Sequence, residues 1–176
     1  TGIYQTKNLC TVLESVNQLQ QLGFEISNEQ LKFGLQNTKQ LTGLHGRWEL
    51  LQSNPTIIAD VGHNEDGIRQ ILQQVQITKY NHLHIIIGMV KDKDIDQVLS
   101  LLPKTATYYF TKAQIPRALE ENALQDLAKQ QQLKGNTYCN VNKAINNALQ
   151  TASVNDLIIV CGSVFLVGEI DMLIVS

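Results

Sequence analysis

The first part of the chain places apolar residues at the spacing of an α-helix. Between residues 8 and 22 the apolar positions recur every three or four residues, at Leu9, Val12, Leu13, Val16, Leu19 and Leu22. This period predicts an amphipathic helix over Asn8–Gln21. Gly23 follows, and a glycine just beyond the last periodic residue is typical of a helix end.

A second helix and a linker are predicted between residues 27 and 46. Ser27 and Gln30 have the spacing of a capping box, and apolar residues follow at helical spacing, at Leu31 and Leu35. The stretch from Thr38 to Gly46 contains two glycines and is typical of a linker. We therefore expect residues 1–45 to form two helices and a linker ahead of a separate domain.

Beyond residue 46, strand and helix patterns alternate. Strands are expected at Trp48–Gln52, Thr56–Asp60, Leu83–Met89, Thr107–Phe110, Thr137–Cys139 and Leu157–Cys161. The helical segments between them carry apolar stripes at Ile68, Ile71, Leu72 and Val75, at Ile95, Val98, Leu99 and Leu102, at Leu119, Ala123, Leu124 and Leu127, and at Ala144, Ile145, Ala148 and Leu149. Residues 56–59 and 84–87 are apolar on nearly every position, as parallel strands with two buried faces are. The alternation predicts an α/β domain over residues 46–176, with a Rossmann-like, mostly parallel sheet and helices on both faces.

Composition and charge are those of a globular protein. The chain has 176 residues, of which 43% are hydrophobic and 17% charged, and a net charge of −2. It has no run of basic residues and no apolar stretch of membrane-spanning length, so neither nucleic-acid nor membrane binding is expected. Cys10, Cys139 and Cys161 are widely spaced and lack metal-ligand spacing, which predicts reduced thiols in a cytoplasmic protein.

In a parallel α/β sheet ligands bind beyond the carboxyl ends of the strands, and the loop after residue 59 is polar. Asp60 would close a buried strand, where its carboxylate can accept hydrogen bonds from a ribose diol. His63 and Asn64 begin the next helix, whose free backbone N–H groups favour anions. The alternative is structural: Asn64 caps the helix and Asp60 ties down the loop.

Two further strand ends carry polar residues. Lys91 and Lys93 follow the strand at 83–89 and can neutralise phosphate, although a solvated charge cluster with Asp94 as a helix cap is the favoured local interpretation. Ser163 follows the last strand and can donate to an anion, but a cap of the apolar helix at 164–170 is again favoured.

Arg47 has a guanidinium that is permanently charged and suited to bidentate phosphate contact, with a surface ion pair as the ordinary alternative. His82 and His84 have strand spacing without other ligands nearby, so no metal site is predicted there. Trp48 is expected to pack in the core.

Several short blocks occur in one order along the chain. They are Gly46-Arg47, Asp60-x-x-His63-Asn64, Met89-x-x-Asp92-Lys93-Asp94 and the stretch from Gly162 to Glu169, with a weaker block at Phe110-Thr111 and Pro116-Arg117-Ala118. This order resembles the carboxy-terminal domain of folylpolyglutamate synthase and of the bifunctional dihydrofolate synthase, members of the Mur ligase superfamily. The segment Gly2-Ile3-Tyr4-Gln5-x-x-Asn8 is similar to the end of that family's central ATPase domain, so the resemblance spans nearly the whole chain.

The resemblance implies a reaction in which ATP phosphorylates a folate carboxylate and the amino group of L-glutamate attacks the acyl phosphate to form an amide. The nucleotide-binding residues that it implies are Asn8 for adenine, Arg47 for the phosphates, Asp60 for the ribose and His63 against the adenosine, with Asn64 as a further nucleotide-binding residue. Arg47 would also be catalytic, because phosphoryl transfer depends on positioned positive charge. Lys93 and Ser163 are candidate contacts of glutamate or phosphate.

Some features depart from the family pattern. Gly62 and Glu65 stand where the family usually has Ala and Pro, and His45 replaces the usual Pro before Gly46. Neither a G-x-x-x-x-G-K-[ST] phosphate loop nor a Mg²⁺ ligand set occurs, so these and most of the folate site are expected elsewhere in a longer parent enzyme. We therefore expect this chain to be inactive alone, and its parent to be monomeric like most of the family. The alternatives are a Mur-type peptidoglycan ligase domain and a stand-alone α/β binding module.

Overall fold

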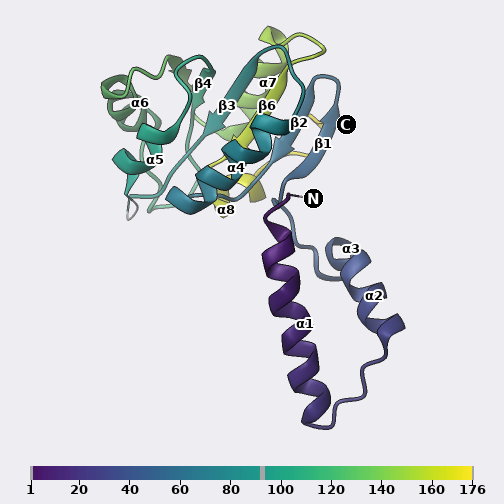
Figure 1. The fold of residues 1–176 in the computed structure, drawn as a ribbon. Coiled ribbons are helices and arrows are strands. Elements are labelled where there is room, and N and C mark those ends of the chain that lie inside the picture. The colour runs from purple at the N-terminus through teal and green to yellow at the C-terminus, as the bar shows by residue number, and fades with distance from the viewer. Residues whose placement is uncertain (1, 92–93, 176) are drawn as a thin grey trace. The chain divides into compact units, whose positions relative to one another are not determined.

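The computed structural model describes residues 2–91 and 94–175, and the chain divides into two compact units, Thr1–His45 and Gly46–Ser176. The first unit is built from helices, and the second contains the sheet (Figure 1). Within the described ranges, no helix has both the length and the hydropathy that crossing a membrane requires.

The helical unit contains α1 (Gln5–Gln21), α2 (Asn28–Gln36) and α3 (Thr38–Thr42). Gly23, at φ 92°, follows the end of α1, and Ser27 and Gln30 form the predicted capping box ahead of α2. The predicted linker is wrong over residues 38–42. These residues include neither glycine nor proline and continue as α3 until Gly43, whose φ is 65°.

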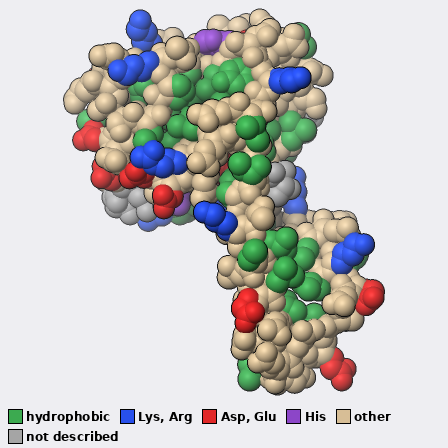
Figure 2. Space-filling view, in the orientation of Figure 1, with side chains coloured by type: hydrophobic (Ala, Val, Ile, Leu, Met, Phe, Trp, Pro, Cys, Tyr) green, Lys and Arg blue, Asp and Glu red, His purple; other side chains and the backbone are tan. Residues whose placement is uncertain are grey.

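Apolar side chains lie at the surface of this unit (Figure 2), and among residues 2–45 only Gly2 is buried. Its exposed large apolar side chains include Leu13, Leu22, Phe24, Phe33 and Leu41. The three helices therefore have little core of their own.

The second unit is built on a six-stranded sheet in the order β1-β2-β6-β3-β4-β5. Its strands are β1 (Glu49–Ser53), β2 (Thr56–Ala59), β3 (Leu83–Ile87), β4 (Thr107–Phe110), β5 (Gly135–Thr137) and β6 (Leu157–Cys161). Its helices are α4 (Glu65–Ile77), α5 (Ile95–Leu101), α6 (Glu121–Gln130), α7 (Val141–Thr151) and α8 (Val164–Gly168). Only β1 is antiparallel to its neighbour, so the predicted α/β class and mostly parallel sheet are confirmed.

Both faces of the sheet are covered, as predicted. Ile85 and Ile87 pack in one apolar cluster with α4, α5 and α6, whereas Ile86 packs in a second cluster with α7. Neighbouring residues of a strand point to opposite faces, so these helices lie on opposite sides of the sheet. Every residue of β3 and of β6 is buried, which explains why β6 is apolar throughout and β3 at every position except His84.

Some predicted boundaries are wrong. β5 lies two residues earlier than expected, because Gly135 pairs with Tyr108, where a Cβ atom would stand only 1.9 Å from the Tyr108 carbonyl oxygen. α6 begins at Glu121 and excludes Leu119, whose N–H donates instead to the Met89 carbonyl. These elements are set by contacts between distant segments rather than by local periodicity.

Candidate functional site

Four parallel strands end side by side, and their backbone contacts continue into the loops beyond them. The Gly162 N–H donates to the Gly62 carbonyl in the loop after β2 at 2.9 Å. The N–H groups of Gly88 and Thr111 donate to the last residues of β6 and β3, the carbonyls of Cys161 and Ile87, at 3.4 and 2.9 Å. Gly162 has a φ of 102°, and a Cβ there would lie 2.6 Å from the Gly88 carbonyl oxygen. The close approach requires glycine and brings the three polar loops onto one edge of the sheet.

Asp60 lies at the end of β2, and its side chain faces the protein. The residue is only 4% exposed. Its Oδ2 accepts the Trp48 N–H at 2.8 Å, and its Oδ1 accepts the Gly62 N–H at 2.9 Å. The structural alternative for Asp60 is thereby confirmed, while the ribose contact stays a prediction.

Arg47 lies in a short segment that is held against this loop. The Gly46 carbonyl accepts the Val61 N–H at 2.9 Å, and the Gly46 N–H donates to Glu49 Oε2 at 2.8 Å. Arg47 itself is exposed, with its Nη1 3.4 Å from the Gly46 carbonyl oxygen. The fold therefore brings the backbone next to Arg47 to the Asp60 loop, and the phosphate contact of Arg47 stays a prediction.

His63 presents a defined nitrogen at the same edge. Its Nδ1 lies 2.9 Å from the Val61 carbonyl oxygen. A carbonyl can only accept, so Nδ1 carries the proton and a neutral His63 keeps Nε2 as a hydrogen-bond acceptor. The half-buried ring is therefore suited to a hydroxyl donor, such as one on a sugar.

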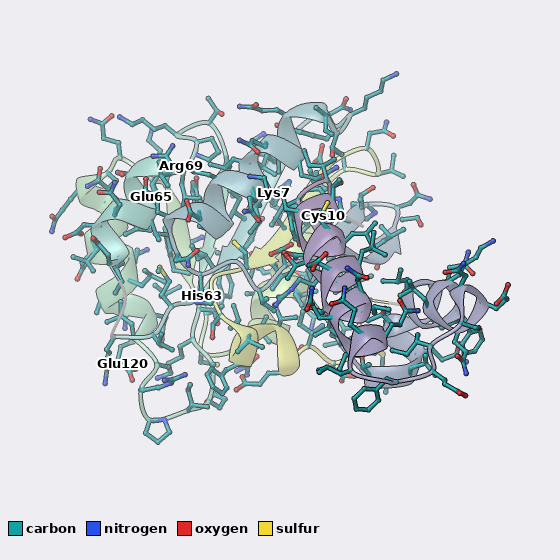
Figure 3. All side chains as sticks on the ribbon, turned by 60° about the horizontal axis from the view of Figure 1, so that its bottom comes forward. Lys7, Cys10, His63, Glu65, Arg69 and Glu120 are labelled. Carbon is teal, nitrogen blue, oxygen red and sulfur yellow. The ribbon has the colours of Figure 1, made fainter. Side chains whose placement is uncertain are left out.

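Asn64 is the N-cap of α4, and its Oδ1 accepts the Gly67 N–H at 2.8 Å, so the cap interpretation is confirmed. Glu65 and Asp66 occupy the first turn. Glu65 lies beside Arg69 (Figure 3), and its Oε1 is 2.6 Å from Arg69 Nη2. The hydrogen bond from Arg69 lowers the pKa of Glu65. With two carboxylates there, this helix start is poorly suited to a phosphate, and the anion-binding interpretation is weakened.

At the other strand ends, side chains cap helices. Asp94 Oδ1 accepts the Gln97 N–H at 3.2 Å. Ser163, 5% exposed, accepts the Phe165 N–H at 3.2 Å. Both favoured cap interpretations are thus confirmed, whereas Lys93 lies outside the described residues.

Arg117 is a cation at this edge that the sequence alone did not place. The guanidinium carbon of Arg117 lies 4.8 Å from the centre of the Phe165 ring. The backbone carbonyl of Arg117 accepts the Lys91 N–H at 3.0 Å. The only signal in the sequence was the weak Pro116-Arg117-Ala118 block. Lys112, in the same loop, pairs with Glu120 and Glu121, and its hydrogen bond to Glu120 raises the pKa of Lys112.

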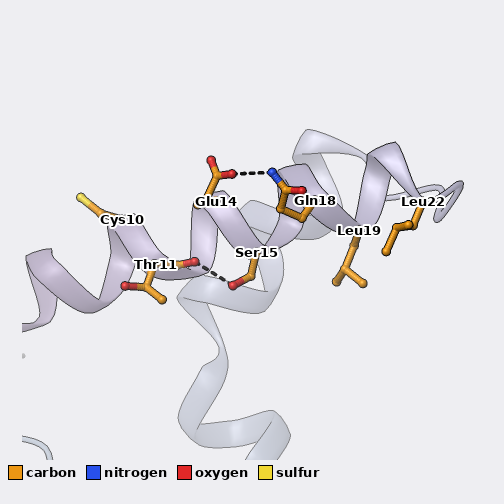
Figure 4. Close-up of a pocket in the computed structure, with 7 residues that line it drawn as sticks. All are labelled: Cys10, Thr11, Glu14, Ser15, Gln18, Leu19 and Leu22. Carbon is orange, nitrogen blue, oxygen red and sulfur yellow. Dashed lines mark hydrogen bonds between the residues drawn. The ribbon is translucent and has the colours of Figure 1, made fainter.

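Asn8 belongs to the helical unit, where its exposed Nδ2 donates to Gln5 Oε1 at 2.9 Å on α1. A pocket on the same helix is lined by Cys10, Thr11, Glu14, Ser15, Gln18, Leu19 and Leu22 (Figure 4). None of the strand-end residues lines it.

The amino edge of the sheet holds a buried polar network. Asp156, 6% exposed, accepts the N–H groups of Ser153 and His82 at 2.7 and 3.0 Å. His84 Nε2 lies 3.4 Å from Asp156 Oδ2, and His84 Nδ1 lies 2.9 Å from the Tyr109 hydroxyl oxygen. Burial lowers the pKa of His84. Across residues 2–91 and 94–175, no group of three His, Cys, Asp or Glu side chains is arranged to hold a metal ion.

Comparison with known proteins gives a consistent picture. A family model described as Mur ligase, glutamate ligase domain, matches residues 46–164. The chain is 28% identical over 171 residues to the probable bifunctional folylpolyglutamate synthase/dihydropteroate synthase of Haloferax volcanii. This alignment covers 96% of this chain and 19% of the Haloferax protein.

Two solved structures share this fold. Folylpolyglutamate synthase of Mycobacterium tuberculosis, complexed with ADP and AMPPCP, is 25% identical to this chain with a TM-score of 0.75. The match covers 95% of this chain and 39% of the Mycobacterium chain. A bifunctional folylpolyglutamate synthase/dihydrofolate synthase with Mn, AMPPNP and L-glutamate bound has a TM-score of 0.69 and 26% identity over 84% of this chain and 34% of its own. The chain thus spans between 19% and 39% of the length of these proteins.

Proposed function

We propose that this chain, which belongs to the Mur ligase family through its glutamate ligase domain, is one part of an ATP-dependent ligase that joins L-glutamate to folates. The relatives support this, since they are folylpolyglutamate synthases, one of them with an ATP analogue and L-glutamate bound. The observation that supports the proposal is that Gly46, the residue before Arg47, and the ring of His63 both hydrogen-bond to the Val61 backbone at the carboxyl edge of the matching domain.

The proposed reaction has two steps. A carboxylate oxygen of the folate attacks the γ-phosphorus of ATP, ADP leaves, and an acyl phosphate forms. The amino group of glutamate then attacks the acyl carbon, phosphate leaves with the bonding electrons, and the nitrogen releases a proton to water, so that an amide remains. Arg47 contributes a fixed positive charge to the phosphoryl transfer, which depends on positioning and charge stabilisation.

The remaining residues have supporting roles in this proposal. His63 accepts a hydrogen bond from an adenosine hydroxyl, and Asn8 contacts adenine. Ser163 and Lys93 are contacts for glutamate or phosphate, and Asn64 shapes the loop beneath the adenosine. The ribose contact of Asp60 has the weakest support, because both carboxylate oxygens already accept backbone N–H groups.

Among the described residues, no group of three His, Cys, Asp or Glu side chains is arranged to hold a divalent metal ion. We therefore place the Mg²⁺ ligands in another part of the parent enzyme and derive no step through the metal here. The cytoplasmic location, the monomeric state and a dihydrofolate synthase activity stay predictions.

The test uses the full-length protein that carries this chain. ADP release is measured with a folate, L-glutamate, Mg²⁺ and ATP, and we expect turnover that needs all four. Arg47→Ala should lower kcat by about 10²–10³-fold, as loss of one charge-stabilising donor does. Arg69→Ala is the matched control, because Arg69 is another exposed arginine of the same unit and forms an ion pair with Glu65, four residues before it on α4.

Two results would contradict the proposal. One is turnover that does not depend on glutamate. The other is an Arg47→Ala enzyme as fast as the Arg69→Ala control.

A further inference from the structure

Side chains near the end of α8 join three loops at the carboxyl edge of the sheet. Glu169 directly follows α8, and its Oε1 accepts the Gln114 N–H, from the loop after β4, at 2.6 Å. The Gln114 side chain in turn donates from Nε2 to the Cys139 carbonyl, beyond β5, at 2.9 Å. One carboxylate therefore fixes the end of α8 to the loop between β4 and α6.

A second side chain holds the same end of α8 from the start of α7. Asn142 lies in the first turn of α7 and is half-buried. Its Nδ2 donates to the Glu169 carbonyl at 3.0 Å, and its Oδ1 accepts the Asp171 N–H at 2.9 Å. We call Gln114, Asn142 and Glu169 the α8 bridge, since together they hold the residues that follow α8.

Ser163 lies at the opposite end of α8, where it is the N-cap. Gly162, the residue before it, has a φ of 102° and donates its N–H to the Gly62 carbonyl at 2.9 Å. The Ser163 carbonyl accepts the Val167 N–H at 3.2 Å, which connects Ser163 to the body of the helix. A helix of five residues is only about 7.5 Å long, so a movement of its last residue is carried to its first.

The Ser163 hydroxyl has a proton that it can donate to an anion. Its Oγ accepts the Phe165 N–H at 3.2 Å. A serine oxygen that accepts one hydrogen bond can still donate its own proton. Because Ser163 is only 5% exposed, a small displacement of α8 decides how this hydroxyl meets a ligand.

We propose that Glu169 is a positioning residue, which holds α8 so that the Ser163 hydroxyl is directed at an oxyanion of the substrates. This rests on the proposed function, in which Ser163 contacts glutamate or phosphate. The oxyanion is therefore a carboxylate of L-glutamate or a phosphate oxygen of ATP. Positioning matters here because a misplacement of about 1 Å can cost about 10²-fold in rate.

The place of the Gln114–Glu169 hydrogen bond separates positioning from general stabilisation. Gln114 is exposed and Glu169 is half-buried. When the carboxylate is removed, water can therefore satisfy the Gln114 N–H, and no buried donor is left without an acceptor. Glu169→Ala should fold and should change the Tm by no more than about 3 °C.

The first test is a double-mutant cycle in the full-length enzyme that carries this chain, with Glu169→Ala and Ser163→Ala. Glu169→Ala should lower kcat/KM by about 10-fold for L-glutamate or for ATP. In the Ser163→Ala background the same substitution should change kcat/KM by no more than about twofold, because the positioned hydroxyl is gone. Two losses that multiply independently, or no loss for either substrate, would overturn the proposal.

The same measurements identify the oxyanion. A loss confined to kcat/KM for L-glutamate assigns it to a carboxylate of glutamate. A loss in kcat/KM for ATP assigns it to phosphate. In either case Ser163→Ala should lower kcat/KM for the same substrate by about 10–100-fold, as the loss of a hydrogen bond to a charged group does. If Glu169→Ala and Ser163→Ala affect different substrates, Glu169 does not act through Ser163.

Glu169→Gln supplies the conservative variant. The amide oxygen of glutamine can accept the Gln114 N–H in place of the carboxylate oxygen. This variant should therefore recover kcat/KM to within about threefold of wild type. If Glu169→Gln is as slow as Glu169→Ala, the charge of Glu169 and not its hydrogen bond to Gln114 sets the rate, and the proposal fails.

Gln125→Ala is the matched control. Gln125 is half-buried on α6, and its Nε2 donates to the Gly135 carbonyl at 2.8 Å, so it too ties a helix to a neighbouring segment. Gly135 begins β5 and so lies at the amino edge of the sheet, away from the loops of the site. Gln125→Ala should leave kcat/KM within about twofold of wild type. A loss equal to that of Glu169→Ala would show that any lost tie lowers the rate, which would overturn the proposal.

Failure of the proposed function is recognised separately. Wild-type enzyme without glutamate-dependent turnover of ATP and a folate would remove the ligase assignment. The α8 bridge is then tested by amide hydrogen exchange in the 176-residue chain. Glu169→Ala should accelerate exchange of the Gln114 and Phe165 amides, whereas Glu169→Gln and Gln125→Ala should not. Unchanged exchange of the Phe165 amide in Glu169→Ala would show that the bridge does not hold the start of α8.

Discussion

Replacing Asp60 by alanine should destabilise the sheet unit strongly. The substitution leaves the Trp48 N–H without its acceptor in a buried site, and the Gly62 N–H without its acceptor in a half-buried one. An unsatisfied buried donor costs about 1–3 kcal/mol, and a half-buried donor recovers part of this from water. We expect a loss of about 3 kcal/mol in the free energy of unfolding, which corresponds to about 10 °C in Tm for a domain of this size.

The chain contains a convenient probe for this measurement. Trp48 is the single tryptophan, and it is buried in the sheet unit, so its fluorescence reports the unfolding of that unit. In urea, a loss of about 3 kcal/mol should move the midpoint by about 1–2 M. Asp94→Ala is the control, because it removes an exposed cap of α5 and should cost only about 1 kcal/mol.

The reasoning depends on the two backbone hydrogen bonds. If Asp60→Ala and Asp94→Ala shift the urea midpoint equally, the Asp60 carboxylate does not hold the two segments together. If Asp60→Ala keeps the wild-type midpoint and raises the KM for ATP, the side chain faces the ribose instead.

Three further outcomes are expected. Gly46→Ala should destabilise the same unit by about 2–4 kcal/mol in urea, because φ is 75° and a Cβ would lie 2.5 Å from Val61, whereas Gly168→Ala, in open space, should change little. The free energy of unfolding should decrease as the pH drops through about 6.5, the ordinary pKa of histidine. Burial lowers the pKa of His84 in the folded chain, so the unfolded chain binds the proton at a higher pH. Urea titrations at several pH values measure this decrease, and His84→Gln should reduce it. The 176-residue chain alone should release no ADP from ATP with folate and glutamate, and calorimetry should give a Kd for ATP of about millimolar or weaker, so micromolar binding would mean that a complete nucleotide site exists here.

Features that depend on neighbouring residues could be predicted from the sequence. The period of α1, its end near Gly23 and the capping box of Ser27 involve residues close together in the chain, so their geometry follows from local spacing. The mostly apolar residues of β2 and β3 likewise indicated strands buried on both faces. The site loops were found because polar residues at strand ends meet at one edge of a parallel sheet.

Features that depend on distant partners could not be predicted in this way. The position of β5 follows from the close approach of Gly135 to Tyr108. Arg117, in the loop after β4, meets Phe165 of α8, which is far away in the sequence. Hydrophobic periodicity shows which face of an element is buried, but it does not show which segment covers that face.

Asp60 shows where the division lies. Its position after an apolar run marked it as a polar residue at the end of a buried strand, and the sequence alone determined that much. Two uses of its carboxylate remained open, a bond to a sugar and a bond to the protein. Only the tertiary structure placed the Trp48 N–H, twelve residues earlier, at 2.8 Å from that carboxylate. The bond to the protein could not be predicted from the sequence, because a hydrogen bond depends on the distance and direction between two groups that only the packed sheet brings together.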